Sequence, residues 1–182
     1  MSRIGKKEIF IPEDIKVEIN RGFVITSKGN LLSKVIIPPG IKVILDNSFV
    51  KVVRENDSKI LRSLHGLIRK LIYNSVTGFS NPFQKTLQVK GVGFKASVSS
   101  GVLTLNVGFS HPVNLNIPRE VSVKIDPKQN QIFFESYDRS ALGEFVATVR
   151  NVRPPEPYKG TGIMYLNERI IRKAGKSASS KK

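Results

Sequence analysis

The sequence predicts an α+β fold with two internally duplicated domains, each a small antiparallel sheet packed against one helix. Three observations favour this class. Short segments alternate apolar and polar residues, two longer segments repeat apolar residues every three or four positions, and the whole order occurs twice along the 182 residues. An apolar fraction of 40% is enough to fill a core in each domain.

The first half begins with strands. Ile15, Val17 and Ile19 alternate with polar residues, which is the pattern of a half-buried strand. Further strands are expected at 23–27, 35–37, 41–45 and 49–54, because glycine, proline and asparagine turns separate these segments. The spacing predicts an antiparallel meander.

A helix is expected after the last of these strands. Asp57 or Ser58 can cap its N-terminus. We expect an exit at 76–78 and a domain boundary at Asn81–Pro82. The apolar stripe is expected to consist of Leu61, Leu64, Ile68, Leu71 and Ile72. The cations expected to lie off that stripe are Arg62, Arg69 and Lys70.

The second half repeats the first. Gly22 corresponds to Gly101 at an offset of 79, and Asp57 corresponds to Asp138 at an offset of 81. This drift is what one-residue loop insertions produce, and duplication explains it better than chance matching of turn residues. The second helix has its apolar stripe at the same phase as the first. That stripe consists of Leu142, Phe145, Val146 and Val149.

The predicted domains are an N-terminal α+β repeat at 1–81 and a C-terminal α+β repeat at 82–182. Only the second helix runs into a long appendage, which starts with the proline-rich segment 153–157. We call the appendage, residues 153–182, the basic arm. Function should therefore be asymmetric between the two repeats.

The charge balance favours an anionic partner. The chain has 30 Lys and Arg against 14 Asp and Glu, a net charge of +16. Nucleic acid is the first partner to consider, an anionic membrane the second and acidic proteins the third. Because the chain has no cysteine, it has no disulfide, thiolate metal site or cysteine nucleophile. The N-terminus lacks the apolar segment of a signal peptide, so the protein is expected to stay in the compartment where it is made.

The basic arm has the chemistry of an anion-binding segment. Residues 151–182 carry eight basic and two acidic residues. Three prolines within 154–157 stiffen the chain, and two glycines flank Thr161, where a backbone can approach another surface closely. A solvated cationic tail is the plain alternative, but it would not need the interleaved Tyr158, Ile163, Met164 and Tyr165. We expect the arm to be ordered, except for residues 177–182, which have almost no apolar surface to bury.

Two phosphate-binding motifs and two histidines invite other interpretations. Residues 91–96 fit a dinucleotide fingerprint and residues 175–177 resemble the end of a phosphate loop, but neither has the required strand and helix around it. His65 lies beside the apolar stripe and is expected to be structural or partly exposed, and His111 precedes Pro112 in a turn. We expect no catalytic residue, metal site or cofactor.

Four segments resemble one known family, the bacterial-type large-subunit ribosomal protein L6. They are residues 1–7 (MSRIGKK) with Ile11–Pro12, 90–96 (KGVGFKA), 108–113 (GFSHPV) and 153–160 (RPPEPYKG) with Gly162–Ile163. The resemblance covers nearly the whole chain in order, and the proline, tyrosine, lysine and glycine segment is highly specific.

The resemblance implies a duplicated structural protein of the large ribosomal subunit. Its partners would be large-subunit rRNA, neighbouring ribosomal proteins and, nearby, translational GTPases. The C-terminal domain would bind rRNA near the sarcin-ricin loop, and the N-terminal domain would act as a spacer or docking body. The ribosome would be that of a bacterial cytoplasm or of a plastid or mitochondrion.

The resemblance also assigns the candidate rRNA contacts residue by residue. The family usually has cations where this chain has Thr161 and Met164, so the contact with RNA at these two positions should be weaker or differently shaped. The predicted contacts are Arg153, Tyr158, Lys159, Gly160, Thr161, Gly162, Arg169, Arg172, Lys173 and Lys176, with Lys90 and Lys95 as weaker candidates.

Two rival functions remain to be compared with rRNA binding. A metal-dependent basic nuclease would need clustered carboxylates, whereas the arm has only Glu156 and Glu168. A peripheral membrane protein would need a basic amphipathic helix with bulky aromatic anchors, which the sequence lacks.

Overall fold

The computed structural model describes residues 4–20, 22–46, 48–127 and 129–175. The chain divides into two compact units, Met1–Pro82 and Phe83–Lys182. Within the described residues each unit combines antiparallel sheets with one helix, which confirms the predicted α+β class.

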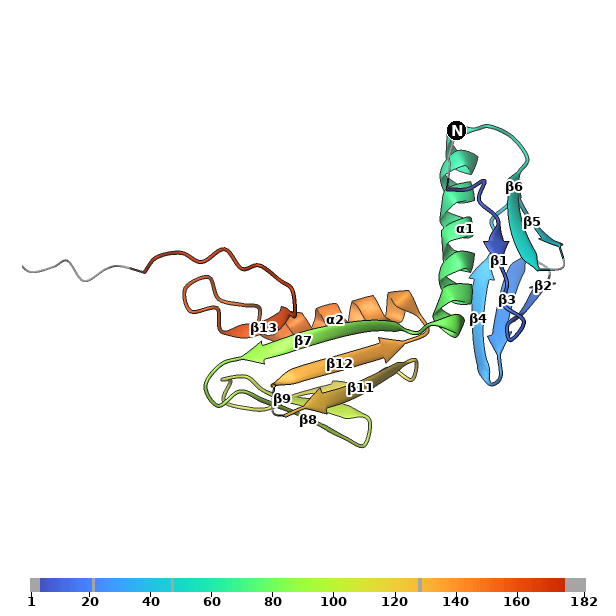
Figure 1. The fold of residues 1–182 in the computed structure, drawn as a ribbon. Helices are drawn as coiled ribbons and strands as arrows, with labels where there is room; N and C mark the ends of the chain where they lie inside the picture. Colours follow the sequence, from blue (N-terminus) through green and yellow to red (C-terminus); the bar gives the residue numbers. More distant parts are fainter. Residues whose placement is uncertain (1–3, 21, 47, 128, 176–182) are drawn as a thin grey trace, which may run out of the picture. The chain divides into compact units, whose positions relative to one another are not determined.

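The N-terminal unit is built from two three-stranded antiparallel sheets with the orders β1-β6-β5 and β2-β3-β4 (Figure 1). The expected strands are present, but they divide between two sheets, and β1 was not expected. Helix α1 packs against strands of both sheets. The elements are β1 (Ile9–Phe10), β2 (Lys16–Asn20), β3 (Phe23–Lys28), β4 (Leu31–Ile36), β5 (Ile41–Asp46), β6 (Phe49–Arg54) and α1 (Lys59–Ser80).

Local chemistry sets both ends of α1. The Ser58 hydroxyl accepts a hydrogen bond from the Leu61 N–H at 3.3 Å, which confirms the predicted cap. The helix continues through Gly78 to Ser80, so the expected exit at 76–78 is wrong. It ends before Pro82 because Asn81, as the residue preceding a proline, is extended, with φ −133° and ψ 101°.

The buried face of α1 is wider than the apolar pattern predicted. Ile68 and Ile72 are buried as expected, and the three leucines of the expected stripe are partly buried. Arg69 was expected off the stripe, and this is wrong, because its side chain is also buried. Its guanidinium donates to the backbone carbonyls of Lys7 (3.1 Å) and Glu8 (3.3 Å), so burial leaves the charge with hydrogen-bond partners.

His65 is a structural residue of this unit. It is 3% exposed, and its Nε2 lies 2.9 Å from the Val52 carbonyl oxygen. Its Nδ1 lies 3.1 Å from Nη1 of Arg54. Because a guanidinium can only donate, Nδ1 accepts and Nε2 carries the proton.

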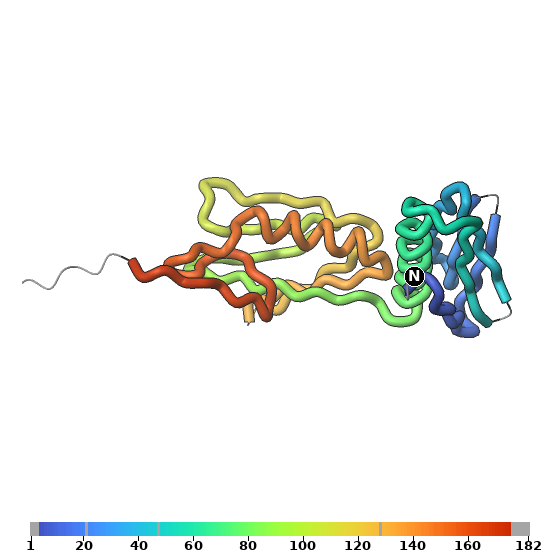
Figure 2. The backbone as a smooth tube through the Cα atoms, turned by 90° about the horizontal axis from the view of Figure 1, so that it is seen from above, coloured from blue at the N-terminus to red at the C-terminus, as the bar shows by residue number. Residues whose placement is uncertain are grey.

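The C-terminal unit repeats this plan with one extra strand. Its sheets have the orders β10-β9-β8 and β11-β12-β7-β13, and α2 packs against β7, β12 and β13. Figures 1 and 2 show α2 running beside β7, with the red C-terminal segment at the end where α2 finishes. The elements are β7 (Phe83–Lys90), β8 (Lys95–Ser99), β9 (Val102–Asn106), β10 (Val113–Asn116), β11 (Val121–Asp126), β12 (Gln131–Ser136), α2 (Arg139–Val152) and β13 (Gly162–Tyr165).

One hydrophobic core joins the elements of the C-terminal unit. The predicted stripe of α2 is entirely buried. It faces inward residues of β7, β9, β12 and β13, and Phe134 meets Phe145 edge to face with ring centroids 5.9 Å apart. Ile163 of β13 is fully buried in the same cluster, so this strand of the basic arm belongs to the core.

The duplication is visible in matching hydrogen bonds. The Ile37 N–H donates to the Gly22 carbonyl at 2.8 Å, and the Ile117 N–H donates to the Gly101 carbonyl at 2.9 Å. Both glycines have positive φ, 87° and 78°, which explains why glycine occurs at both positions. The β1–β6 pair corresponds to the β7–β12 pair, whereas β13 has no counterpart among the described N-terminal residues.

The rejected dinucleotide motif lies in a turn. Gly91 and Gly93 connect β7 to β8, and the Phe94 N–H donates to the Gly91 carbonyl at 3.4 Å. A strand follows this turn where the fingerprint would require a helix.

Candidate nucleic-acid interface

The basic arm starts as a closed loop. We call residues 153–161 the arm loop and residues 166–175 the arm tail. Within the arm loop, the Glu156 N–H donates to the Thr161 carbonyl at 2.9 Å, and the Gly160 N–H donates to the Glu156 carbonyl at 3.0 Å. The prolines supply stiffness and these two bonds supply closure, so the loop has a defined shape.

Strand β13 attaches the arm to the unit. It pairs antiparallel with β7, with Gly162 opposite Lys90 and Ile163 opposite Val89. On its other edge, the Ile163 N–H donates to the Arg153 carbonyl at 2.8 Å, and the Tyr165 N–H donates to Oε2 of Glu168 at 3.0 Å. The arm itself therefore covers donors that an edge strand would leave open.

The two glycines that flank Thr161 pack against protein. Gly162 is buried with φ 139°, and a Cβ there would lie 2.7 Å from the Pro154 carbonyl oxygen. Gly160 is buried with φ 68°, and a Cβ there would lie 3.3 Å from Nη2 of Arg172. Close backbone approach was expected here, and the structure supplies an intramolecular reason for it.

Both acids of the arm have internal partners. The Thr161 hydroxyl donates to Oε2 of Glu156 at 3.0 Å. The Arg150 guanidinium of α2 donates to both carboxylate oxygens of Glu168, with Nε lying 3.0 Å from Oε2. The hydrogen bond from Arg150, supported by the Tyr165 N–H, lowers the pKa of Glu168 despite its partial burial.

The described cations of residues 159–175 lie at the surface. Lys159 is exposed in the arm loop, and the tail residue Lys173 donates its N–H to the Pro157 carbonyl at 2.9 Å, which holds tail and loop together. Tyr158 is 54% exposed beside these charges. The other exposed cations of the arm tail are Arg169 and Arg172.

The remaining predicted contacts differ in their surroundings. The half-buried Arg153 lies over the ring of Phe109, with Cζ 5.2 Å from its centroid. Lys90 is exposed beside β13, whereas Lys95 is exposed on β8, in the other sheet of the unit. Thr161 is half-buried and bonded to Glu156, and Lys176 lies outside the described residues.

Sequence reasoning missed the residues that position the arm. Tyr165 lies between two cations, with Nζ of Lys85 5.0 Å and Cζ of Arg150 5.8 Å from its ring centroid. The signal that was present is Glu168, an acid in a cationic segment. Met164, a position where the family resemblance implies a cation, is 8% exposed.

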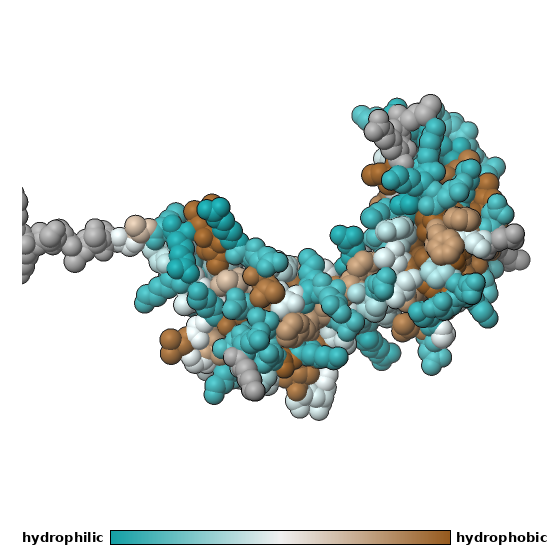
Figure 3. Space-filling view, viewed as in Figure 1, coloured by the Kyte–Doolittle hydropathy of each residue, from teal (hydrophilic) through white to brown (hydrophobic). Residues whose placement is uncertain are grey.

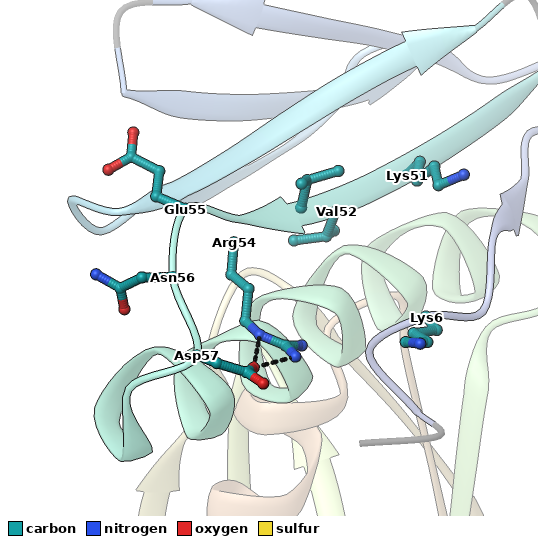
Figure 4. Close-up of a pocket in the computed structure, with 8 residues that line it drawn as sticks. Lys6, Lys51, Val52, Arg54, Glu55, Asn56 and Asp57 are labelled. Carbon is teal, nitrogen blue, oxygen red and sulfur yellow. Dashed lines mark hydrogen bonds and ion pairs between the residues drawn. The ribbon is translucent and has the colours of Figure 1, made fainter. Parts of the chain in front are cut away.

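A hollow lies in the N-terminal unit. It has a volume of about 590 Å³ and is lined by residues of both charge signs, including Lys6, Lys51 and Glu55. Figure 4 shows Arg54 reaching Asp57 within it, with Nε 2.8 Å from Oδ1, and this hydrogen bond lowers the pKa of Asp57. The mixed charge distinguishes this hollow from the basic arm.

Two features are absent from the described residues. In 4–20, 22–46, 48–127 and 129–175 there is no cluster of three or more His, Asp or Glu placed to hold a metal ion. Neither helix of that part of the chain has the length and apolar character needed to cross a membrane.

Known proteins similar to this chain define the class of protein to which it belongs. The chain is 43% identical over 185 residues to "Large ribosomal subunit protein uL6" of Carboxydothermus hydrogenoformans, with 100% of both chains covered. It is 45% identical to the protein of the same name from Dictyoglomus thermophilum, covering 97% of this chain and 98% of the relative. It is also 45% identical to "Large ribosomal subunit protein uL6c" of Phaeodactylum tricornutum, covering 98% and 99%. These relatives define a ribosomal protein, which is a structural and non-enzymatic class.

The particular family follows from the two duplicated segments. The family model described as "Ribosomal protein L6" matches residues 11–81 and 90–166 of this chain. The chain belongs to the ribosomal protein L6 family, which confirms the resemblance found in the sequence. A structural, non-enzymatic family gives no support to the nuclease alternative.

Proposed function

We propose that this protein is assembled into the large ribosomal subunit by binding large-subunit rRNA through its C-terminal unit, with the basic arm as the principal contact. The observation that carries the proposal is the separation of charge in the arm. Glu156 and Glu168 are bonded internally, whereas Lys159, Arg172 and Lys173 are exposed. The arm therefore offers phosphates a net positive surface, in which Arg150 compensates the charge of Glu168 and the Thr161 hydroxyl occupies one oxygen of Glu156.

Order in the arm supports the same proposal. Side chains that are already placed lose less entropy on binding than a free tail would. The arm is placed by strand β13, by the Arg150–Glu168 ion pair and by the bond from Lys173 to Pro157. Tyr158, exposed beside Lys159, is available to pack on a sugar or a base.

The location within the subunit is the finer part of the proposal. Following the family resemblance, we place the arm near the sarcin-ricin loop, beside the region where translational GTPases dock. The N-terminal unit then serves as a spacer or docking body that meets neighbouring ribosomal proteins. Chemical footprinting of assembled subunits tests this placement, because loss of the arm should expose nucleotides at the sarcin-ricin loop.

Salt dependence tests the rRNA contacts. Changing Lys159, Arg172 and Lys173 together to alanine should weaken rRNA binding and flatten the plot of log affinity against log salt by about 0.7 to 0.9 for each lost phosphate contact. The matched control changes three exposed lysines of the N-terminal unit, Lys16, Lys34 and Lys59, to alanine. Equal slopes for both variants would refute the assignment.

A further inference from the structure

The C-terminal unit has a small three-stranded sheet, β10-β9-β8. Its inner face carries Leu103 and Leu105, which are fully buried in the core. In each strand, the residues between the inward-facing ones point to the side of the sheet that lies away from the core. We call this side the outer face. The outer face consists of Lys95, Ser97, Ser99, Val102, Thr104, Asn106, Asn114 and Asn116.

Hydroxyls and amides dominate this outer face, and it has no acid. All of its residues except Val102 and Thr104 are exposed, and those two are half-buried. Residues 83–119, which include the whole sheet, contain Lys85, Lys90, Lys95 and Arg119 but no Asp or Glu. Solvated strands usually mix both charge signs, so a surface free of carboxylates is suited to a polyanion.

The duplicated sheet in the N-terminal unit gives an internal comparison. The corresponding face of β2-β3-β4 carries Glu18 where the second copy has Ser97, at an offset of 79. It also carries Phe23 and Ile36, which are 42% and 68% exposed. Figure 3 shows brown apolar side chains among the teal ones on the N-terminal unit. The same scaffold therefore has an apolar, mixed-charge face in one copy and a polar, acid-free face in the other.

A turn next to the small sheet contacts the basic arm. At one end of the sheet, Phe94 packs beneath two turns, since a Cβ on Gly91 or Gly108 would lie 2.5 Å or 3.0 Å from its ring. The second turn presents Phe109, which is 48% exposed and lies against Arg153 of the arm loop. A cation–aromatic pair therefore links the arm loop to the turn between β9 and β10.

We propose that the outer face of β10-β9-β8 is a second rRNA-docking surface, which contacts the sugar–phosphate backbone alongside the basic arm. The proposal rests on rRNA binding by the C-terminal unit and adds a second site to it. Serine and threonine hydroxyls and asparagine amides exchange hydrogen bonds with phosphate oxygens and 2′-hydroxyls, which are the contacts that position RNA without reading its sequence. The absence of carboxylates on the face lets a phosphate chain approach without like-charge repulsion.

The test adds charge to the face in the full-length protein and measures affinity for its own large-subunit rRNA, transcribed in vitro. Ser97→Glu with Ser99→Glu should lower the affinity about tenfold at low salt, because two carboxylates would face the phosphates. The scaffold accepts this residue, since the first copy has Glu18 at the position of Ser97. The control, Asn20→Glu with Asn30→Glu, makes the same change in net charge at exposed sites of the N-terminal unit and should alter the affinity less than about twofold.

A reverse pair keeps the test independent of folding defects. Ser97→Lys with Ser99→Lys should tighten binding and steepen the salt dependence by up to about 0.9 for each new phosphate contact, whereas Asn20→Lys with Asn30→Lys should not. If the face variants behave like their controls while the triple arm variant still loses affinity, the second site is refuted and the arm proposal stands. If the arm variant also binds normally, the proposed function itself fails.

Discussion

Arg150 of helix α2 and Glu168 of the arm tail form a two-point ion pair across the base of the basic arm. Both carboxylate oxygens of Glu168 accept from the guanidinium, and Oε2 also accepts from the Tyr165 N–H. The two side chains are only 26% and 24% exposed. A free acid in a cationic segment would weaken RNA binding. Here the acid is paired, and the pair holds the start of the cationic arm tail against helix α2.

Removing this anchor should weaken RNA binding although no cation is lost from the arm. Glu168→Gln keeps the size of the side chain and removes its charge, so we expect a looser arm tail and a loss of about 1 to 2 kcal/mol in unfolding free energy for the C-terminal unit. Limited proteolysis should cut the variant faster between β13 and the arm tail, and rRNA affinity should fall. Glu144→Gln, at an exposed site of α2, is the control. Proteolysis at the wild-type rate would show that the ion pair does not hold the arm.

The same ion pair predicts a pH dependence of stability. Arg150 lowers the pKa of the folded Glu168 below its ordinary value of 4.5. The stabilisation is therefore complete above the unfolded pKa and is lost as the pH falls through the folded pKa. Thermal unfolding followed from pH 6 downward should show the wild type and Glu168→Gln converging in acid. Asp14 and Asp57 also have lowered pKa values, through Lys28 and Arg54, but both proteins contain them, so they cancel in the comparison.

Local patterns predicted much of the fold because local physics decides it. The cap at Ser58, the stripe of α2 and the glycine turns depend on neighbouring residues, and sequence spacing records them directly. The duplication was readable for the same reason, since Gly22 and Gly101 are both required by positive φ.

Long-range pairing was not predictable in this way. Residues 162–165 read as an ordered part of the arm, but nothing local identifies β7 as their partner strand. Arg69 was expected off the apolar stripe of the helix, whereas its burial depends on two carbonyls of the N-terminal segment. In the candidate site, too, local features were predictable from the sequence and long-range contacts were not. The cations were visible in the sequence, but the hydrogen-bond partners of Glu156 and Glu168 were not.

Gly162 should be intolerant of any side chain. Its φ of 139° strains an L-residue, and a Cβ would lie 2.7 Å from the Pro154 carbonyl oxygen and 2.8 Å from the Pro155 Cα. Gly162→Ala should therefore destabilise the C-terminal unit by about 2 to 4 kcal/mol in chemical denaturation. Gly143→Ala is the matched contrast, because a Cβ at this position in α2 meets nothing within 4 Å, and it should stabilise by about 0.5 to 1 kcal/mol. Equal effects from the two substitutions would contradict the close packing of the arm loop on β13.

Arg69 should be needed to hold the N-terminal segment on the first unit. Its guanidinium reaches the carbonyls of Lys7 and Glu8, immediately before β1, while its side chain is only 8% exposed. Arg69→Met preserves much of the apolar stem but leaves both carbonyls without this donor, so we expect a loss of about 1 to 3 kcal/mol. Hydrogen exchange should report the change locally, with faster exchange in β1 than in β3. Arg62→Met, at an exposed site of the same helix, should leave both strands unchanged, and equal exchange of β1 in the two variants would show that Arg69 is not its anchor.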